Sequence, residues 1–165
     1  MKGPDQNRVP RSLCKPPTGL SIPHGKAEAL QNWPVPTSVA EVRSVLGTFG
    51  FWRQYIRLYA NIVEPLVALT RKATPWGWGE REQQAFERLK CAVQDSPVLK
   101  HPDQDLPFIV VTDASDYAVG ASVEQTDAQG QRRPCLFFSH RLNPAERKYP
   151  VHERELLAIV LALRT

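Results

Sequence analysis

The sequence predicts a mixed α/β fold, in which a small helical unit precedes three antiparallel strands and a final helix. Apolar residues recur at helical spacing through the first half of the 165-residue chain. Three strand-like runs follow at residues 108–113, 118–125 and 135–139, and a Gly-containing loop at 127–133 separates the last two. This order of elements predicts a small sheet covered by helix.

Residues 1–18 are rich in proline and basic residues and lack apolar periodicity, which is typical of a disordered leader. A short helix is expected at 27–32. Ser38, with Glu41 three residues later, forms a capping box and begins a second helix. The apolar stripe of this second helix extends over residues 42–56, so we expect one uninterrupted helix there.

Asn61 is expected to cap a further short helix, with Glu64 at its third position. The paired helices define a helical region at 19–73. Another helix is predicted over 80–94, because apolar residues recur on one of its sides and a Ser-Pro pair ends it.

The last helix is expected at 152–164. Its residues are apolar almost all round, which predicts burial against the sheet. A helix of this kind normally leads into another strand, so we interpret the chain as ending inside a domain that occupies 74–165.

Composition narrows the class of protein. The net charge of +4 and the pI of about 9.1 are compatible with a polyanionic partner. The three cysteines are far apart, so neither a disulfide framework nor a zinc site is indicated. The sequence shows no secretory signal and no apolar stretch long enough for a membrane, so we expect an intracellular protein, cytoplasmic or nuclear.

Two carboxylates stand out in the α/β part. Asp113 ends the first strand-like run on the same face as Ile109 and Val111, and Glu155 lies 155 − 113 = 42 positions later, where the last helix begins. If Glu155 faces the sheet, the two carboxylates meet and begin a divalent-metal site. The alternatives are a turn-forming role for Asp113 and a favourable interaction of Glu155 with the helix N-terminus.

One flank of the second helix is a candidate nucleic-acid surface. At about 100° per residue, an uninterrupted helix places small, polar and basic residues together on one side: Arg43, Gly47, Gly50, Gln54 and Arg57. The glycines let the backbone approach a groove while the arginines contact phosphates. The alternative is that the glycines allow a neighbouring helix to pack closely.

Several motifs occur in a fixed order along the chain: Val42-Arg43-Ser44-Val45-Leu46-Gly47, Phe51-Trp52-Arg53-Gln54-Tyr55-Ile56, Thr112-Asp113-Ala114-Ser115-Asp116-Tyr117, Ser139-His140-Arg141-Leu142-Asn143-Pro144 and Glu155-Leu156-Leu157-Ala158. Together they closely resemble the Pol polyprotein of gypsy-type LTR retrotransposons. The resemblance runs from the thumb of the reverse transcriptase into its ribonuclease H-like domain.

The resemblance implies an incomplete ribonuclease H-like domain preceded by a helical thumb. Asp113 and Glu155 match two of the four carboxylates with which such enzymes hold two Mg²⁺ ions, Mn²⁺ being an alternative, to cleave RNA in RNA–DNA hybrids. The other two carboxylates and the polymerase site fall outside the matched region, so weak or no activity is implied for this chain alone. The flank that begins at Arg43 matches the thumb helix that follows the template–primer duplex.

The leading hypothesis is therefore a fragment of a retrotransposon-derived reverse transcriptase and ribonuclease H. Its expected partners are an RNA–DNA hybrid or duplex nucleic acid, and the rest of a Pol product. The alternative hypothesis is a non-enzymatic relic, retained by the host, that binds nucleic acid or protein through its helical region.

Overall fold

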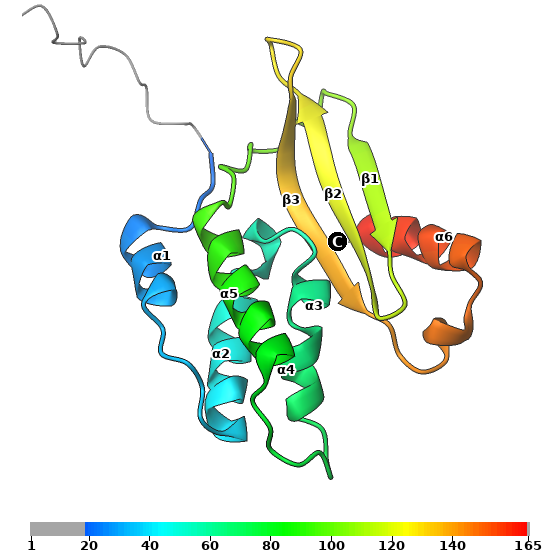
Figure 1. Cartoon of the computed structure of the whole chain (residues 1–165). Helices are drawn as coiled ribbons and strands as arrows, with labels where there is room; N and C mark the ends of the chain where they lie inside the picture. The colour runs from blue at the N-terminus through cyan, green and yellow to red at the C-terminus, as the bar shows by residue number, and fades with distance from the viewer. Residues whose placement is uncertain (1–18, 165) are drawn as a thin grey trace, which may run out of the picture.

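A computed structural model describes residues 19–164, and the leader expected at residues 1–18 lies outside the described part. The elements follow in the order α1 His24–Gln31, α2 Val39–Phe51, η1 Arg53–Tyr55, α3 Tyr59–Ile62, α4 Glu64–Leu69, α5 Glu80–Gln94, β1 Ile109–Ala114, β2 Ala118–Thr126, β3 Arg132–Arg141, η2 Glu146–Lys148 and α6 Val151–Ala162. Figure 1 shows α1 to α5 gathered in one body beside the sheet, with α6 on the other side, next to β1.

Helix α2 begins where the sequence predicts and ends earlier than expected. The Ser38 hydroxyl accepts the Glu41 N–H at 3.3 Å, and the Glu41 carboxylate accepts the N–H of Thr37, at 2.7 Å, instead of that of Ser38. The helix stops at Phe51, and the short helix η1 follows it. The prediction of an uninterrupted helix to Ile56 is wrong, because the chain bends to bury Ile56 fully in an extended conformation.

The next turn also differs from the prediction. Asn61 lies inside α3 and caps nothing; the residue before α3 is Leu58, in the left-handed conformation. Glu64 begins α4, where its nearly buried carboxylate accepts a hydrogen bond from Arg81 Nη2 at 2.8 Å. Glu64 therefore links α4 to α5 instead of forming a cap.

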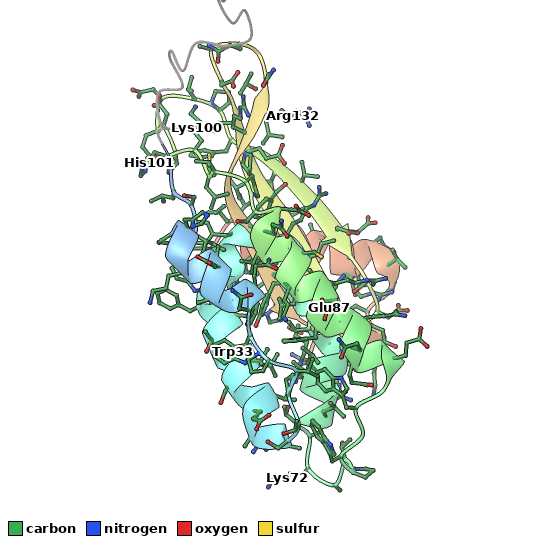
Figure 2. All side chains as sticks on the ribbon, turned by 60° about the vertical axis from the view of Figure 1, so that its left-hand side comes forward. Trp33, Lys72, Glu87, Lys100, His101 and Arg132 are labelled. Carbon is green, nitrogen blue, oxygen red and sulfur yellow. The ribbon has the colours of Figure 1, made fainter. Side chains whose placement is uncertain are left out.

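Helix α5 has the predicted bounds and completes the helical core. It buries Phe86, Leu89 and Val93 in the helical core, and it packs against α1, α3 and α4. Leu99, after the helix, joins the same core, and Leu20 pairs with it as an isolated β-bridge. Figure 2 shows the length of the molecule, with Glu87 on α5, Lys72 at the far helical end and Arg132 toward the tip of the sheet.

The three strands form an antiparallel sheet in the order β1-β2-β3, which confirms the predicted fold class. Asp113 pairs with Gly120, and Gly120 pairs with Ser139, so these three residues form one row across the sheet. A register shift between Val123 and Glu124 marks a bulge toward the hairpin end. Helix α6 packs on β1 and β2, whereas η1 and α3 pack on β3.

Only one side of α6 is buried. Ala158 packs with Val119 and Leu142 in a small second core, while Leu156 and Leu163 remain 60% and 71% exposed. The predicted packing of this helix against the sheet is confirmed, but the three strands cover only one face of it. Within residues 19–164, no helix has the length and apolar character needed to cross a membrane.

Candidate functional site

Asp113 lies near the end of β1 on the sheet face that turns toward the helical region. Its neighbour Ala114 packs in the α6 core with Val119, and alternation along the strand directs Asp113 to the opposite face. The residue is exposed, and it lines a small hollow together with Arg57 and Leu58. The sequence predicted its place at the strand end but not the helical residues beside it.

Glu155 is exposed in α6, and the residues around it show how the helix is anchored. Arg154 donates from Nη1 to the Ser115 carbonyl at 2.8 Å and to Asp116 Oδ1 at 2.9 Å. The start of α6 is therefore tied to the turn that follows β1. Glu155 is exposed and lies three positions before the buried Ala158, so its expected approach to Asp113 stays a prediction.

The carboxylates of Asp113 and Glu155 make no hydrogen bond or ion pair with any other described residue. Residues 19–164 contain no group of three or more His, Cys, Asp and Glu side chains placed to hold a metal ion. Mg²⁺ requires about six oxygen ligands in near-octahedral geometry. Two exposed carboxylates without a third described donor beside them do not make up a complete Mg²⁺ site, so we derive no metal-dependent reaction from these residues. Their role as metal ligands stays a prediction.

The predicted nucleic-acid residues divide into two groups. Arg43, Gly47 and Gly50 lie on α2, whereas Gln54 is in η1 and Arg57 comes after it. The expectation that all five share one helical flank is wrong, because the helix ends before Gln54. Nucleic-acid binding by any of them stays a prediction.

The two glycines of α2 have different surroundings. A Cβ at Gly50 would lie 3.3 Å from the Tyr59 hydroxyl, which donates to the Leu46 carbonyl at 3.1 Å. Burial raises the pKa of Tyr59 to about 12. Close packing against Tyr59 therefore explains the glycine at position 50, in agreement with the alternative that the helix glycines serve packing. Gly47 is exposed with open space around it, so no packing contact requires a glycine there.

An open surface on α2 remains, which we call the α2 flank: Arg43, Gly47 and Phe51, each four residues apart. Arg43 is exposed and makes a long contact of 3.5 Å to the Thr70 carbonyl. Phe51 is 75% exposed, although it is a large apolar residue. Phe51 was not among the predicted nucleic-acid residues; its position four residues after Gly47 and off the apolar stripe was the available signal.

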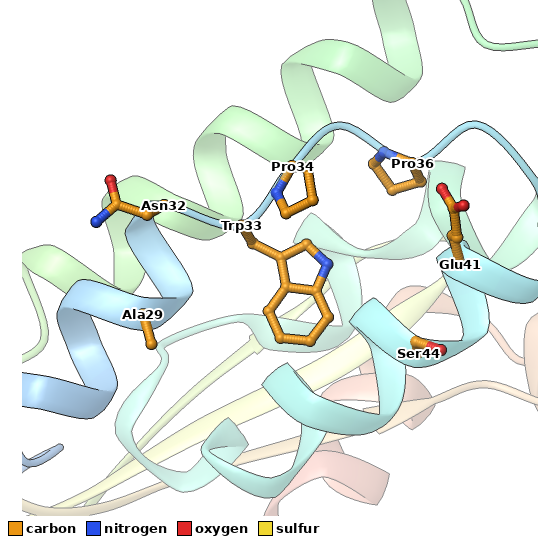
Figure 3. Close-up of a pocket in the computed structure, with 7 residues that line it drawn as sticks. All are labelled: Ala29, Asn32, Trp33, Pro34, Pro36, Glu41 and Ser44. Carbon is orange, nitrogen blue, oxygen red and sulfur yellow. The ribbon is translucent and has the colours of Figure 1, made fainter.

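Two further hollows lie on the described surface. Arg53 and Gln54 line one of about 170 Å³ against Phe137 and Ser139 of β3. The other, about 490 Å³, lies between α1 and α2; in Figure 3 the Trp33 ring lies beneath Pro34, and the remaining lining residues are Ala29, Asn32, Pro36, Glu41 and Ser44. The Glu41 carboxylate there is already engaged by Thr37, so this second hollow offers no free ionisable group.

The described part combines an antiparallel sheet, an acid near the end of β1 and a second acid early in α6. These features are those of a ribonuclease H-like unit. The family described as the RNase H-like domain found in reverse transcriptase matches residues 78–165, and the chain belongs to this family. The match includes α5, although that helix packs in the core of the helical region.

The particular relatives are Pol polyproteins of transposons. The chain is 37% identical over 150 residues to the retrovirus-related Pol polyprotein from transposon 297 of Drosophila melanogaster, covering 90% of this chain and 14% of that protein. It is 33% identical over 132 residues to the transposon Tf2-3 polyprotein of Schizosaccharomyces pombe, covering 80% of this chain and 10% of that protein. The chain thus spans a small part of the length of these relatives.

Among solved structures, the chain is similar to the foamy viral protease–reverse transcriptase. The dRH form in complex with double-stranded DNA aligns with a TM-score of 0.73 and 25% identity, covering 88% of this chain and 26% of that one. The protein in complex with an RNA/DNA hybrid aligns with a TM-score of 0.72 and 25% identity, covering 88% and 20%. The alignment extends through both the helical region and the sheet, because it covers most of the chain.

Proposed function

We propose that this chain is the thumb and ribonuclease H-like part of a gypsy-type LTR retrotransposon Pol polyprotein, and that it binds double-helical nucleic acid through its helical region. The observation that carries the proposal is the α2 flank, where the exposed residues Arg43, Gly47 and Phe51 follow one another at four-residue spacing along one side of the helix. The similar foamy viral structures contain double-stranded DNA and an RNA/DNA hybrid, which supports the same class of ligand here.

The chemistry of the flank suits a duplex. An exposed glycine lets the helix backbone approach the sugar–phosphate surface, and an arginine one turn away supplies a phosphate contact. An exposed aromatic ring beside them offers apolar contact with sugars or base edges. Phe51 is 75% exposed, so its ring is accessible for such a contact.

Direct binding measurements test this proposal. We expect an RNA–DNA hybrid to bind with an affinity that falls as salt rises, because counterions are released from neutralised phosphates. Arg43→Ala and Phe51→Ala should each weaken binding roughly three- to ten-fold, in line with about 1 kcal/mol per contact. Arg88→Ala on α5 is the matched control, since Arg88 is also exposed and its loss changes the net charge equally.

The Arg88→Ala control shows whether the loss of binding is specific to the α2 flank. If Arg88→Ala weakens binding as much as Arg43→Ala, the protein binds only through its overall charge and the α2 flank has no special role. Undetectable hybrid binding by the folded wild-type chain at low salt contradicts the proposal as a whole.

We further propose that domains of this lineage cleave RNA, whereas this chain alone cleaves RNA weakly or not at all. The reason is that the described residues offer at most two metal-binding carboxylates. The test is cleavage of an end-labelled RNA–DNA hybrid in Mg²⁺ and in Mn²⁺, beside Asp113→Asn and Glu155→Gln. We expect no cleavage above that of the two variants. Robust cleavage that both substitutions abolish would contradict this expectation and restore an enzymatic role.

Association with another part of a Pol product is a second candidate function. The exposed side of α6, with Leu156 and Leu163, lies beside β1, which is an edge strand of the sheet. An unpaired strand edge next to an apolar helix favours a partner that adds a strand and covers the helix. In pull-down or titration experiments, we expect such a segment of a Pol product to bind this chain. The substitution Leu156→Lys in this chain should weaken that binding.

A further inference from the structure

The turn before α3 holds a strained residue that connects the helical region to the sheet. Leu58 has φ 55° and ψ 32°, a left-handed conformation that costs a non-glycine residue about 1 kcal/mol or more. Its side chain packs onto Gly120 of β2, where an added Cβ would lie only 2.8 Å from Leu58 Cδ2. Gly120 therefore provides the space that Leu58 fills, and this contact helps to hold the strained turn.

A hydrogen bond fixes the same junction two residues later. The backbone N–H of Ala60 donates to Ser139 Oγ at 2.7 Å, between residues 79 positions apart. Ser139, Gly120 and Asp113 share one row of the sheet. The turn at Leu58 is thus held over the row that ends in Asp113.

This arrangement brings Arg57 to the strand-end carboxylate. Arg57 and Asp113 line the same hollow, and both are exposed. No ion pair joins them in the described part of the chain, so the guanidinium is not neutralised by Asp113. The nearby Glu124 carboxylate already accepts the Ser122 hydroxyl at 2.6 Å. Arg57 is therefore a solvent-accessible cation at the end of β1, with no ion pair or hydrogen bond to its guanidinium among residues 19–164.

We propose that Arg57 contacts a backbone phosphate of bound nucleic acid beside Asp113, so that the helical region supplies a phosphate contact to the ribonuclease H-like half. The inference rests on the nucleic-acid binding proposed above and adds a second contact point, separate from the α2 flank. A guanidinium binds phosphate oxygens in a bidentate manner. Asp113 is an anion in the same hollow, so it repels that phosphate when no metal is present.

A double-mutant cycle in EDTA tests whether the two residues act on one phosphate. Arg57→Ala is expected to weaken hybrid binding and to reduce the slope of log K against log salt by roughly 0.9, the value for one phosphate contact. Asp113→Asn should tighten binding on the order of three-fold, by removing a repulsion. In the Arg57→Ala background the gain from Asp113→Asn should disappear, because the phosphate is no longer held there.

The junction gives a further readout that does not alter the charge. Leu58→Gly removes the side chain that packs on Gly120 and relaxes the turn, so it should reduce the coupling between Arg57 and Asp113 while both remain in place. Circular dichroism and a cooperative melt verify that each variant is folded.

The outcomes separate this inference from the proposed function. Additive effects of Arg57→Ala and Asp113→Asn, in a protein that binds hybrid normally, contradict the shared phosphate and leave the α2 flank intact. Absence of hybrid binding by the wild-type chain contradicts the proposed function and this inference with it. A coupling that Leu58→Gly leaves unchanged contradicts the role of the junction in placing Arg57.

Discussion

The helical region and the sheet–α6 layer of this protein differ in how far their apolar side chains are buried. Within residues 19–164, the helical core contains fifteen buried side chains, from Ile22 to Leu99. The core between the sheet and α6 contains three, Val119, Leu142 and Ala158. Both regions carry many apolar residues, but only the helical region surrounds them with other elements.

The comparison teaches that apolar sequence alone does not ensure burial. Helix α5 is strongly amphipathic, and its single apolar side meets several helices. Helix α6 is apolar on most sides and meets one face of a three-stranded sheet, so Leu156 and Leu163 stay exposed. Removal of apolar surface from water is the main source of stability, so the helical region should be the more stable half.

The largest expected effect is on the helical core. Phe86 is fully buried and packs edge-on to Trp78, with ring centroids 6.0 Å apart. Phe86→Ala should lower the free energy of unfolding by about 3–5 kcal/mol, the usual cost of an aromatic deletion in a core. Denaturant unfolding measures this loss, and Leu142→Ala in the smaller core should cost about 2 kcal/mol. Equal losses at the two sites would remove the contrast between the regions.

An intermediate effect is expected on solution behaviour. We expect the wild-type chain to self-associate as its concentration rises, because α6 exposes a contiguous apolar surface. Leu156→Lys should reduce this association in sedimentation velocity and change the free energy of unfolding by less than about 0.5 kcal/mol. A substantial loss of stability in this variant would show that the outer side of α6 is already packed within the chain.

The smallest effect is a pH dependence in the connection to α6. Two contacts hold the pKa of the Glu146 carboxyl below its usual value. The first is the hydrogen bond that the Asn143 N–H donates to Glu146 Oε2 at 2.7 Å, and the second is the contact with the His140 ring. A lowered folded-state pKa means that the stabilisation is present above the unfolded value of about 4.3 and is lost as pH falls through the folded value. Glu146→Gln should therefore cost at most about 1 kcal/mol at pH 7.

The pH dependence provides its own control. The difference in thermal stability between the wild type and Glu146→Gln should shrink as pH is lowered from 5 toward about 3, because the carboxyl becomes protonated in both folded and unfolded chains. A difference that stays constant over this range would mean that the charge of Glu146 has no part in the stabilisation.

Local patterns predicted most of the elements. The bounds of α5 follow from its apolar spacing, and the start of α2 follows from the Ser38 cap. The strands follow from their apolar runs and turn residues, with β3 extending further at both ends than expected. Asp113 and Glu155 were also assigned correctly to the end of a strand and the early part of a helix.

Long-range packing decided what these patterns could not. The end of α2 depends on the burial of Tyr55 and Ile56, which periodicity alone presented as a continuing helix. The resulting bend separates Arg57 from Arg43 and places it beside Asp113, 56 positions further along the chain (113 − 57 = 56). No sequence window contains both members of that pair.

The sequence by itself determined the mixed α/β class, the order of the elements and the ribonuclease H-like family, because these depend on local periodicity, caps and motifs. Only the tertiary structure decided that Gly50 serves packing, that Gly47 and Phe51 form an open surface, and that Leu58 rests on Gly120. The physical reason is that exposure and contact depend on which distant segments cover a residue. Those segments are chosen by the packing of the whole chain.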